Sequence, residues 1–199
     1  MIPVLLQPEP ADFDTKVRRR GLKSLTGKQI DPALPLPKGA ELSPFWRDCL
    51  DDLYQAYQQT CAYLAVHFER ATGGTTADHF IAKSKLPGQA YEWTNLRLAS
   101  SIVNARKCNF EDVLDPCTLS QGWFRLELVT GHIYPNPNLN ADDLKRVILT
   151  IERLGLDNQT NRELRARHYE EYCMDDYTAG FLQRRSPFVY WEAKRQGLL

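Results

Sequence analysis

The sequence predicts an α+β protein in which a small strand–strand–helix unit is flanked by helices on both sides. Two short runs typical of strands, at 75–81 and 95–99, are followed directly by a short helical stretch at 100–107. Periodic apolar residues before and after this unit indicate amphipathic helices. With 199 residues, 43% of them hydrophobic, the chain is long enough to bury a core of its own.

Residues 1–42 are expected to form a proline-rich, basic arm. Six prolines interrupt regular structure in this segment, and six basic residues without any acid lie between Thr15 and Ile30. We interpret the arm as either a solvated extended segment or a surface for phosphates or an acidic partner.

Residues 43–118 are expected to hold the functional core and a preceding helix. Ser43 and Pro44 suit a helix start, and apolar residues then recur at three- and four-residue steps to about Gln59. The elements expected after this helix are a turn at 73–74, a strand at 75–81, a loop at 83–91, a strand at 95–99 and a helix at 100–107.

Residues 119–199 are expected to form a β-hairpin followed by helices. The runs 123–129 and 133–134 suit two strands joined by a turn at 130–131. The helices expected after the hairpin run from a cap at Asn140 to Gly155, from the capping box Thr160–Glu163 to about Met174, and over the C-terminal segment that contains Trp191.

Composition excludes several classes of protein. Lys and Arg together number 25, as do Asp and Glu, so a polycation that coats nucleic acid is not expected. No apolar run approaches the ~18 residues of a membrane helix, and the start of the chain does not resemble a signal peptide, so we expect a cytoplasmic protein without membrane contact. The five cysteines include no CxxC pair, so neither a disulfide framework nor a four-thiolate zinc site is expected.

Chemically useful side chains concentrate between residues 78 and 107. Asp78 and His79 lie in the first strand, Asn95 opens the second, and Asn104 lies on the short helix. If the strand lies beside the helix, Asp78 and Asn104 reach one point, and His79 at the strand end can turn toward it. Carboxylate and amide oxygens suit a hard divalent cation, and a neutral imidazole, whose ordinary pKa lies near neutrality, can take a proton from water. The set therefore suits metal-dependent hydrolysis of a phosphodiester.

These residues resemble the motifs of the HNH (ββα-metal) endonucleases. Asp78-His79, followed by Ala82-Lys83-Ser84, is similar to the first strand and loop of that family. Asn95, in Trp93-Thr94-Asn95-Leu96, is similar to its middle element, and Asn104 with Lys107 resembles its final element. Three spaced motifs therefore occur in the family's order.

The resemblance implies a role for each residue. Asp78 and Asn104 would bind Mg²⁺ or Mn²⁺, His79 would be the general base, and Asn95 would orient the histidine loop. Lys107 would lie near the substrate phosphate. From the residues alone, Lys83 and Lys107 are either phosphate contacts or solvated surface charges.

One feature departs from many members of that family. They hold a structural zinc with a CxxC pair before the motif and another after it. Here Leu64 stands three residues after Cys61, and Cys108 also lacks a cysteine partner at that spacing. A structural zinc is therefore not expected.

The flanking regions resemble the HNH subunits of bacterial anti-phage systems of the Septu type. The segments that carry this resemblance are Phe45-Trp46-Arg47, Gly122-Trp123-Phe124 and Ile133-Tyr134-Pro135-Asn136-Pro137. In that group the nuclease is paired with an ATPase, sometimes alongside a retron with its reverse transcriptase and DNA. The resemblance implies an effector nuclease that acts on DNA together with an ATPase subunit.

Two alternatives stay open at this point. The chain could be a catalytically inactive subunit that binds nucleic acid or a partner on an HNH fold, which would require loss of a metal or base position. It could also be a free-standing toxin nuclease with an immunity protein.

Overall fold

The computed structural model describes residues 1–199, apart from the side chains at positions 72 and 73, and shows a mixed α+β protein. The chain divides into two compact units. Residues 6–59 and 69–111 form the N-terminal unit, and residues 1–5, 60–68 and 112–199 form the C-terminal unit. Each unit is thus assembled from separate stretches of chain, whereas three consecutive segments are expected from the sequence.

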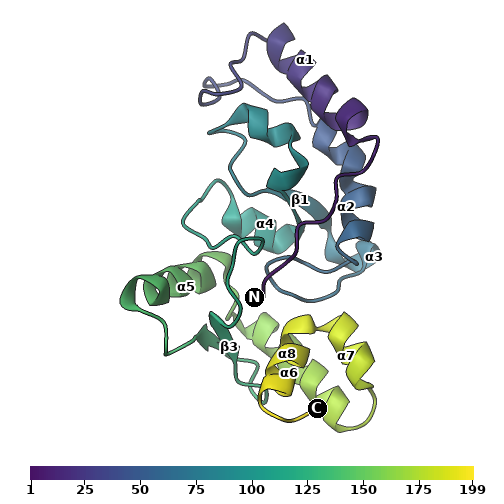
Figure 1. Cartoon of the computed structure of the whole chain (residues 1–199), viewed down its shortest axis with the longest axis vertical. Helices are drawn as coiled ribbons and strands as arrows, with labels where there is room; N and C mark the ends of the chain where they lie inside the picture. Colours follow the sequence, from purple (N-terminus) through teal and green to yellow (C-terminus); the bar gives the residue numbers. More distant parts are fainter. The chain divides into compact units, whose positions relative to one another are not determined.

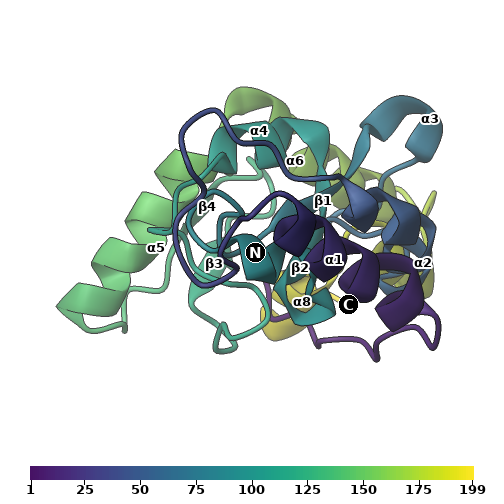
Figure 2. The same ribbon diagram turned by 90° about the horizontal axis from the view of Figure 1, so that it is seen from above.

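A two-stranded sheet and two helices organise the N-terminal unit. Strands β1 (Thr75–His79) and β2 (Leu96–Ser100) pair antiparallel, with His79 opposite Leu96. Helix α4 (Ser101–Lys107) directly follows β2 and packs on both strands, and α2 (Leu50–Ala56) also contacts both. In both ribbon views β1 lies between α2 and α4 (Figures 1 and 2). The strands and the helix expected here are therefore confirmed to within two residues.

The helix expected after Ser43 is confirmed but is shorter. A 3-10 turn at Phe45–Cys49 leads into α2, which ends at Ala56. The Ser43 hydroxyl lies 2.7 Å from the Ser24 hydroxyl, and no side chain caps the helix start. The remaining short elements of this unit are α3 (Arg70–Gly73) and the 3-10 turns Pro87–Tyr91 and Trp93–Asn95.

The expectation of an extended arm is wrong for residues 14–27. A π-helical turn at Asp14–Arg18 continues into α1 (Arg19–Gly27). The six prolines of the first 42 residues all lie outside this stretch, so none of them interrupts it. A helix can therefore form between Pro10 and Pro32.

Burial of one face holds this helix against the unit. Val17 is fully buried, and Leu25 nearly so. Gly21 faces the ring of Tyr91 so closely that an added Cβ would lie 2.1 Å from the ring Cγ. Burial of these few apolar positions stabilises a segment whose sequence is otherwise basic.

Most cations of the N-terminal segment are neutralised within the unit. Arg18 contacts three carboxylates, those of Glu9, Asp14 and Glu92. The other pairs join Lys16 to Asp12 and Asp52, Arg19 to Asp14, and Arg20 to Asp48. The acids come from elsewhere in the sequence or from just outside Thr15–Ile30, so the basic run does not form an unpaired cationic surface.

The C-terminal unit contains the expected hairpin and four helices. Strands β3 (Phe124–Leu126) and β4 (Ile133–Pro135) pair antiparallel, with Leu126 opposite Ile133. Strand β4 contacts α5 and strand β3 contacts α8. The helices are α5 (Ala141–Leu154), α6 (Gln159–Cys173), α7 (Ala179–Arg185) and α8 (Pro187–Arg195). Within the described part of the chain, no helix is long and apolar enough to cross a membrane.

Local capping explains where these helices begin and end. The Asn140 side chain accepts from the Asp143 N–H at 2.9 Å, and Gly155 adopts φ 61°, so the expected bounds of α5 are confirmed. Helix α6 is capped by Asn158, so the expected capping box at Thr160 is misplaced by two residues. The chain after 178 forms two helices rather than one, because Pro187 lacks the N–H that would continue α7.

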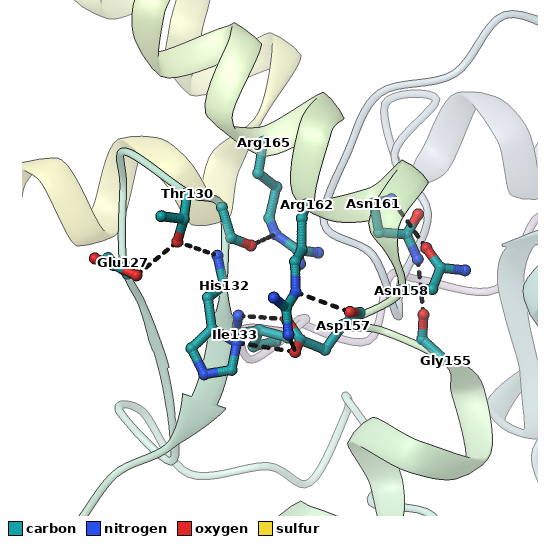
Figure 3. Close-up of polar contacts among 11 residues, drawn as sticks. Glu127, Thr130, His132, Ile133, Gly155, Asp157, Asn158, Asn161, Arg162 and Arg165 are labelled. Carbon is teal, nitrogen blue, oxygen red and sulfur yellow. Dashed lines mark hydrogen bonds and ion pairs between the residues drawn. The ribbon is translucent and has the colours of Figure 1, made fainter.

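A carboxylate joins the β3–β4 hairpin to the start of α6 (Figure 3). Asp157 accepts from the Ile133 N–H at 2.9 Å and from His132 Nδ1 at 2.8 Å, and Arg162 contacts the same group. Burial alone would raise the pKa of Asp157, but the hydrogen bonds from Arg162, the Ile133 N–H and His132 outweigh burial and lower it. The charged form therefore fastens the hairpin to the helix.

Candidate functional site

A pocket of about 520 Å³ in the N-terminal unit brings together side chains from separate parts of the sequence. It runs along β1, with α4 on one wall and the turn before α2 on another. Four residues predicted from the sequence line it, namely Asp78, His79, Lys83 and Asn104. The other two, Asn95 and Lys107, do not contribute to its lining.

Asp78 is held by a buried cation. Its side chain is 2% exposed, and its Oδ1 lies 3.2 Å from Nζ of Lys107. The Lys107 ammonium also donates to the carbonyl oxygens of His79 at 2.8 Å and Phe80 at 3.1 Å. The C-terminal turn of α4 therefore fixes both the carboxylate and the backbone where β1 ends.

Burial contradicts a phosphate contact for Lys107. The side chain is 0% exposed, and its donors are directed to Asp78 and to two backbone carbonyls. A substrate phosphate outside the unit cannot reach this ammonium without dismantling the end of β1. We therefore assign Lys107 to positioning Asp78 and its strand.

The His79 imidazole is oriented on two sides. Its Nε2 lies 3.1 Å from the carbonyl oxygen of Ala90. Because a carbonyl can only accept, Nε2 carries the proton of the neutral ring, and Nδ1 keeps its lone pair. The Trp46 ring meets the imidazole edge to face, with centroids 4.8 Å apart. Both contacts restrict rotation of the ring.

The environment keeps His79 neutral. Burial, followed by the positive charge of Lys83, lowers the pKa of His79 to about 4. The pKa of His79 therefore lies below the near-neutral value that is ordinary for a solvated imidazole. At pH 7 the ring can accept a proton.

Asn95 ties the two loops around His79 together. Its Oδ1 accepts from the Ile81 N–H at 2.8 Å, and its Nδ2 donates to the carbonyls of Ile81 at 3.0 Å and Gln89 at 2.9 Å. The backbone carbonyl of Asn95 accepts from the Phe80 N–H. The side chain is buried, so it acts on the loops and not on a ligand in the pocket.

Asn104 reaches the pocket from the middle of α4. Its Nδ2 donates to Thr76 Oγ1 at 3.1 Å, which orients the amide against β1. An amide held through its nitrogen presents its oxygen as an acceptor. The pocket thus contains one carboxylate and one amide oxygen from two adjoining elements.

The carboxylate oxygen of Asp78 and the amide oxygen of Asn104 are ligand types that suit a hard divalent cation. Oxygen ligands are what Mg²⁺ and Mn²⁺ prefer, and Mg²⁺ keeps several waters or phosphate oxygens when few protein groups bind it. No group of three or more His, Cys, Asp and Glu side chains placed to hold a metal occurs among the described residues. An ion bound by Asp78 and Asn104 alone would need water or substrate oxygens to complete its coordination.

Lys83 also lines the pocket, together with Trp46 and Arg47, which were not predicted as site residues. Lys83 Nζ lies 4.5 Å from the centroid of the Trp46 ring, and Arg47 lines the same wall. Periodicity places Trp46 on an apolar helix face, and nothing in the sequence links Arg47 to a histidine 32 positions later. Only the packing of this turn against the end of β1 brings them to the site.

Comparison with known proteins gives no further assignment. No protein-family model matches the chain, and no curated protein matches it significantly.

Proposed function

We propose that this protein is a metal-dependent endonuclease of the HNH type that hydrolyses phosphodiester bonds, with DNA as the expected substrate. One observation carries the proposal. Asp78, His79 and Asn104, separated by up to 26 positions in the sequence, line one pocket beside an antiparallel strand pair and the helix that follows it. A strand, its antiparallel partner and a helix follow one another here in the order that the resemblance implies, and this order supports the proposal.

The residues divide the chemistry between them. Asp78 and Asn104 would hold Mg²⁺ or Mn²⁺, which when bound neutralises charge on the phosphoryl group and on the departing oxygen. His79 Nδ1 takes a proton from the attacking water, because its Nε2 is committed to Ala90. Asn95 and Lys107 keep the histidine loop and Asp78 in place.

The proposed place of this chain is the effector subunit of an anti-phage system with an ATPase partner. This part depends on the Septu-type resemblance of the flanking segments alone. Co-expression with an ATPase encoded by a neighbouring gene, followed by size-exclusion chromatography, tests it. Elution of the two chains as separate species would contradict the partnership, and toxicity of this chain expressed by itself would favour the toxin alternative.

The nuclease proposal is tested by cleavage of plasmid with purified protein, alone and with that ATPase. We expect cleavage with Mg²⁺ or Mn²⁺, none in excess EDTA, and none from Asp78→Ala. His79→Ala should slow single-turnover cleavage by roughly 10²–10⁴ while metal affinity is kept. Asn104→Ala should weaken metal affinity and recover partly at high Mn²⁺. No cleavage with any metal or partner would favour the inactive binding subunit.

A further inference from the structure

Two cations face the pocket without a carboxylate to neutralise them. Arg47, from the turn before α2, and Lys83, from the loop after β1, both line the pocket and are exposed. Among the described residues, neither has an acid within ion-pair distance. Other cations of the same unit differ in this respect, since Arg20, Arg70 and Lys85 each contact a carboxylate.

The two charges are close enough to influence each other. Partial desolvation of its ammonium, followed by the charge of Arg47, lowers the pKa of Lys83. Two like charges beside one cavity repel each other in the free protein. An anion bound between them removes that repulsion, and this is the arrangement expected of an anion site.

Trp46 fixes this pair relative to the reactive groups. Its ring lies under Lys83 Nζ and packs edge to face on His79. Arg47 is the next residue of the same turn, so its backbone is held with Trp46. The cations are therefore placed beside the imidazole and not on a separate surface.

We propose that Arg47 and Lys83 form a phosphate-binding pair that holds the backbone of a nucleic-acid strand against the Asp78–His79–Asn104 pocket. The placement beside reactive groups rests on the proposed nuclease function, whereas the binding of phosphate does not require turnover. A guanidinium can take two oxygens of one phosphate, and an ammonium supplies a point charge.

The test measures binding with chemistry stopped. Fluorescence anisotropy of the full chain in EDTA uses labelled duplex DNA, single-stranded DNA and single-stranded RNA of one sequence, each over a series of salt concentrations. Each lost contact should reduce the slope of log affinity against log salt by about 0.9 on duplex and about 0.7 on single strands. Arg47→Ala and Lys83→Ala should each show this decrease in slope on the type of strand that the site prefers. The double variant should show the sum of the two decreases.

Two matched variants make the result specific. Arg47→Lys keeps the charge and should retain the slope, with weaker affinity because it loses the two-oxygen contact. Lys23→Ala removes an exposed cation of α1 that is not part of the pocket and should leave affinity and slope unchanged. Thermal melting of each variant checks that the fold is retained.

The outcomes separate this proposal from the nuclease function. If the wild-type chain cleaves plasmid but the alanine variants keep the wild-type slope, the phosphate pair is wrong and the nuclease stands. If the salt slopes fall as expected but no metal supports cleavage, the proposed phosphate-binding pair is supported and the proposed nuclease function is wrong. A wild-type chain that binds none of the three oligonucleotides overturns the pair.

Discussion

Lys107 and Asp78 form an ion pair that is almost wholly withdrawn from solvent, with Nζ and Oδ1 3.2 Å apart and side-chain exposures of 0% and 2%. The same ammonium donates to the carbonyls of His79 and Phe80. One cation from α4 thus holds a candidate metal ligand and the strand end that carries the candidate base.

Lys107→Met should therefore destabilise the protein strongly. The change removes a cation from beside a buried carboxylate and takes a donor from two carbonyls, which costs about 3–5 kcal/mol. Lys85→Met, which breaks an exposed pair with Glu111, should cost at most about 1 kcal/mol. Urea unfolding of both variants measures the difference. Equal losses would mean that the buried pair contributes no more than the exposed one.

Gly21→Ala should destabilise the protein although alanine favours helices. The new Cβ would lie 2.1 Å from Cγ of Tyr91, so the ring or α1 must shift, at a cost of roughly 1–3 kcal/mol. Gly27→Ala, in the same helix, meets nothing within 4 Å and should be stabilising by up to about 1 kcal/mol. Thermal melting compares the two, and a stable Gly21→Ala variant would show that α1 does not pack on Tyr91.

Stability should fall with acid because of His168. Burial, followed by the charge of Arg185, lowers the pKa of His168 to about 4, and its Nδ1 is buried without a hydrogen-bond partner. In the unfolded chain the pKa of this histidine is near 6.5. The free energy of unfolding therefore has its highest value above pH 6.5. It declines by roughly 2 kcal/mol as the pH falls toward 4, because the unfolded chain binds the proton first.

His168→Phe tests this sign. The variant keeps a ring beside Tyr177 and removes the titrating group, so its stability should depend less on pH between 6.5 and 4. Urea unfolding at several pH values measures the slope. Some slope should remain, because His79 also has a lowered pKa. An unchanged slope would assign the acid sensitivity to other groups.

Asn95→Asp should slow cleavage without loss of metal affinity. An aspartate cannot donate to the carbonyls of Ile81 and Gln89, so the loops that hold His79 loosen. Changes to such supporting residues typically reduce activity 10- to 100-fold. Single-turnover rates and metal titrations separate the two effects, with the exposed Asn138→Asp as a control. A wild-type rate would show that the loop tie does not position the base.

Local sequence determined much of the secondary structure. The Asn140 cap and the Gly155 terminus fix α5, because both act on backbone groups within a few residues. The two strands and α4 were likewise predictable. Asp78, His79 and Asn104 cluster because α4 packs on β1, which is the placement on which the prediction depended.

Tertiary structure decided the rest. The helix at 14–27 forms because Val17 and Leu25 are buried and Gly21 packs on Tyr91, a contact across 70 residues that no local pattern encodes. Whether a lysine is a surface charge or an internal support depends on what surrounds it. The sequence alone therefore does not distinguish the buried Lys107 from a surface lysine, and it does not place Arg47 at the pocket. The pKa of His79 is also a tertiary property, because desolvation by distant residues sets it.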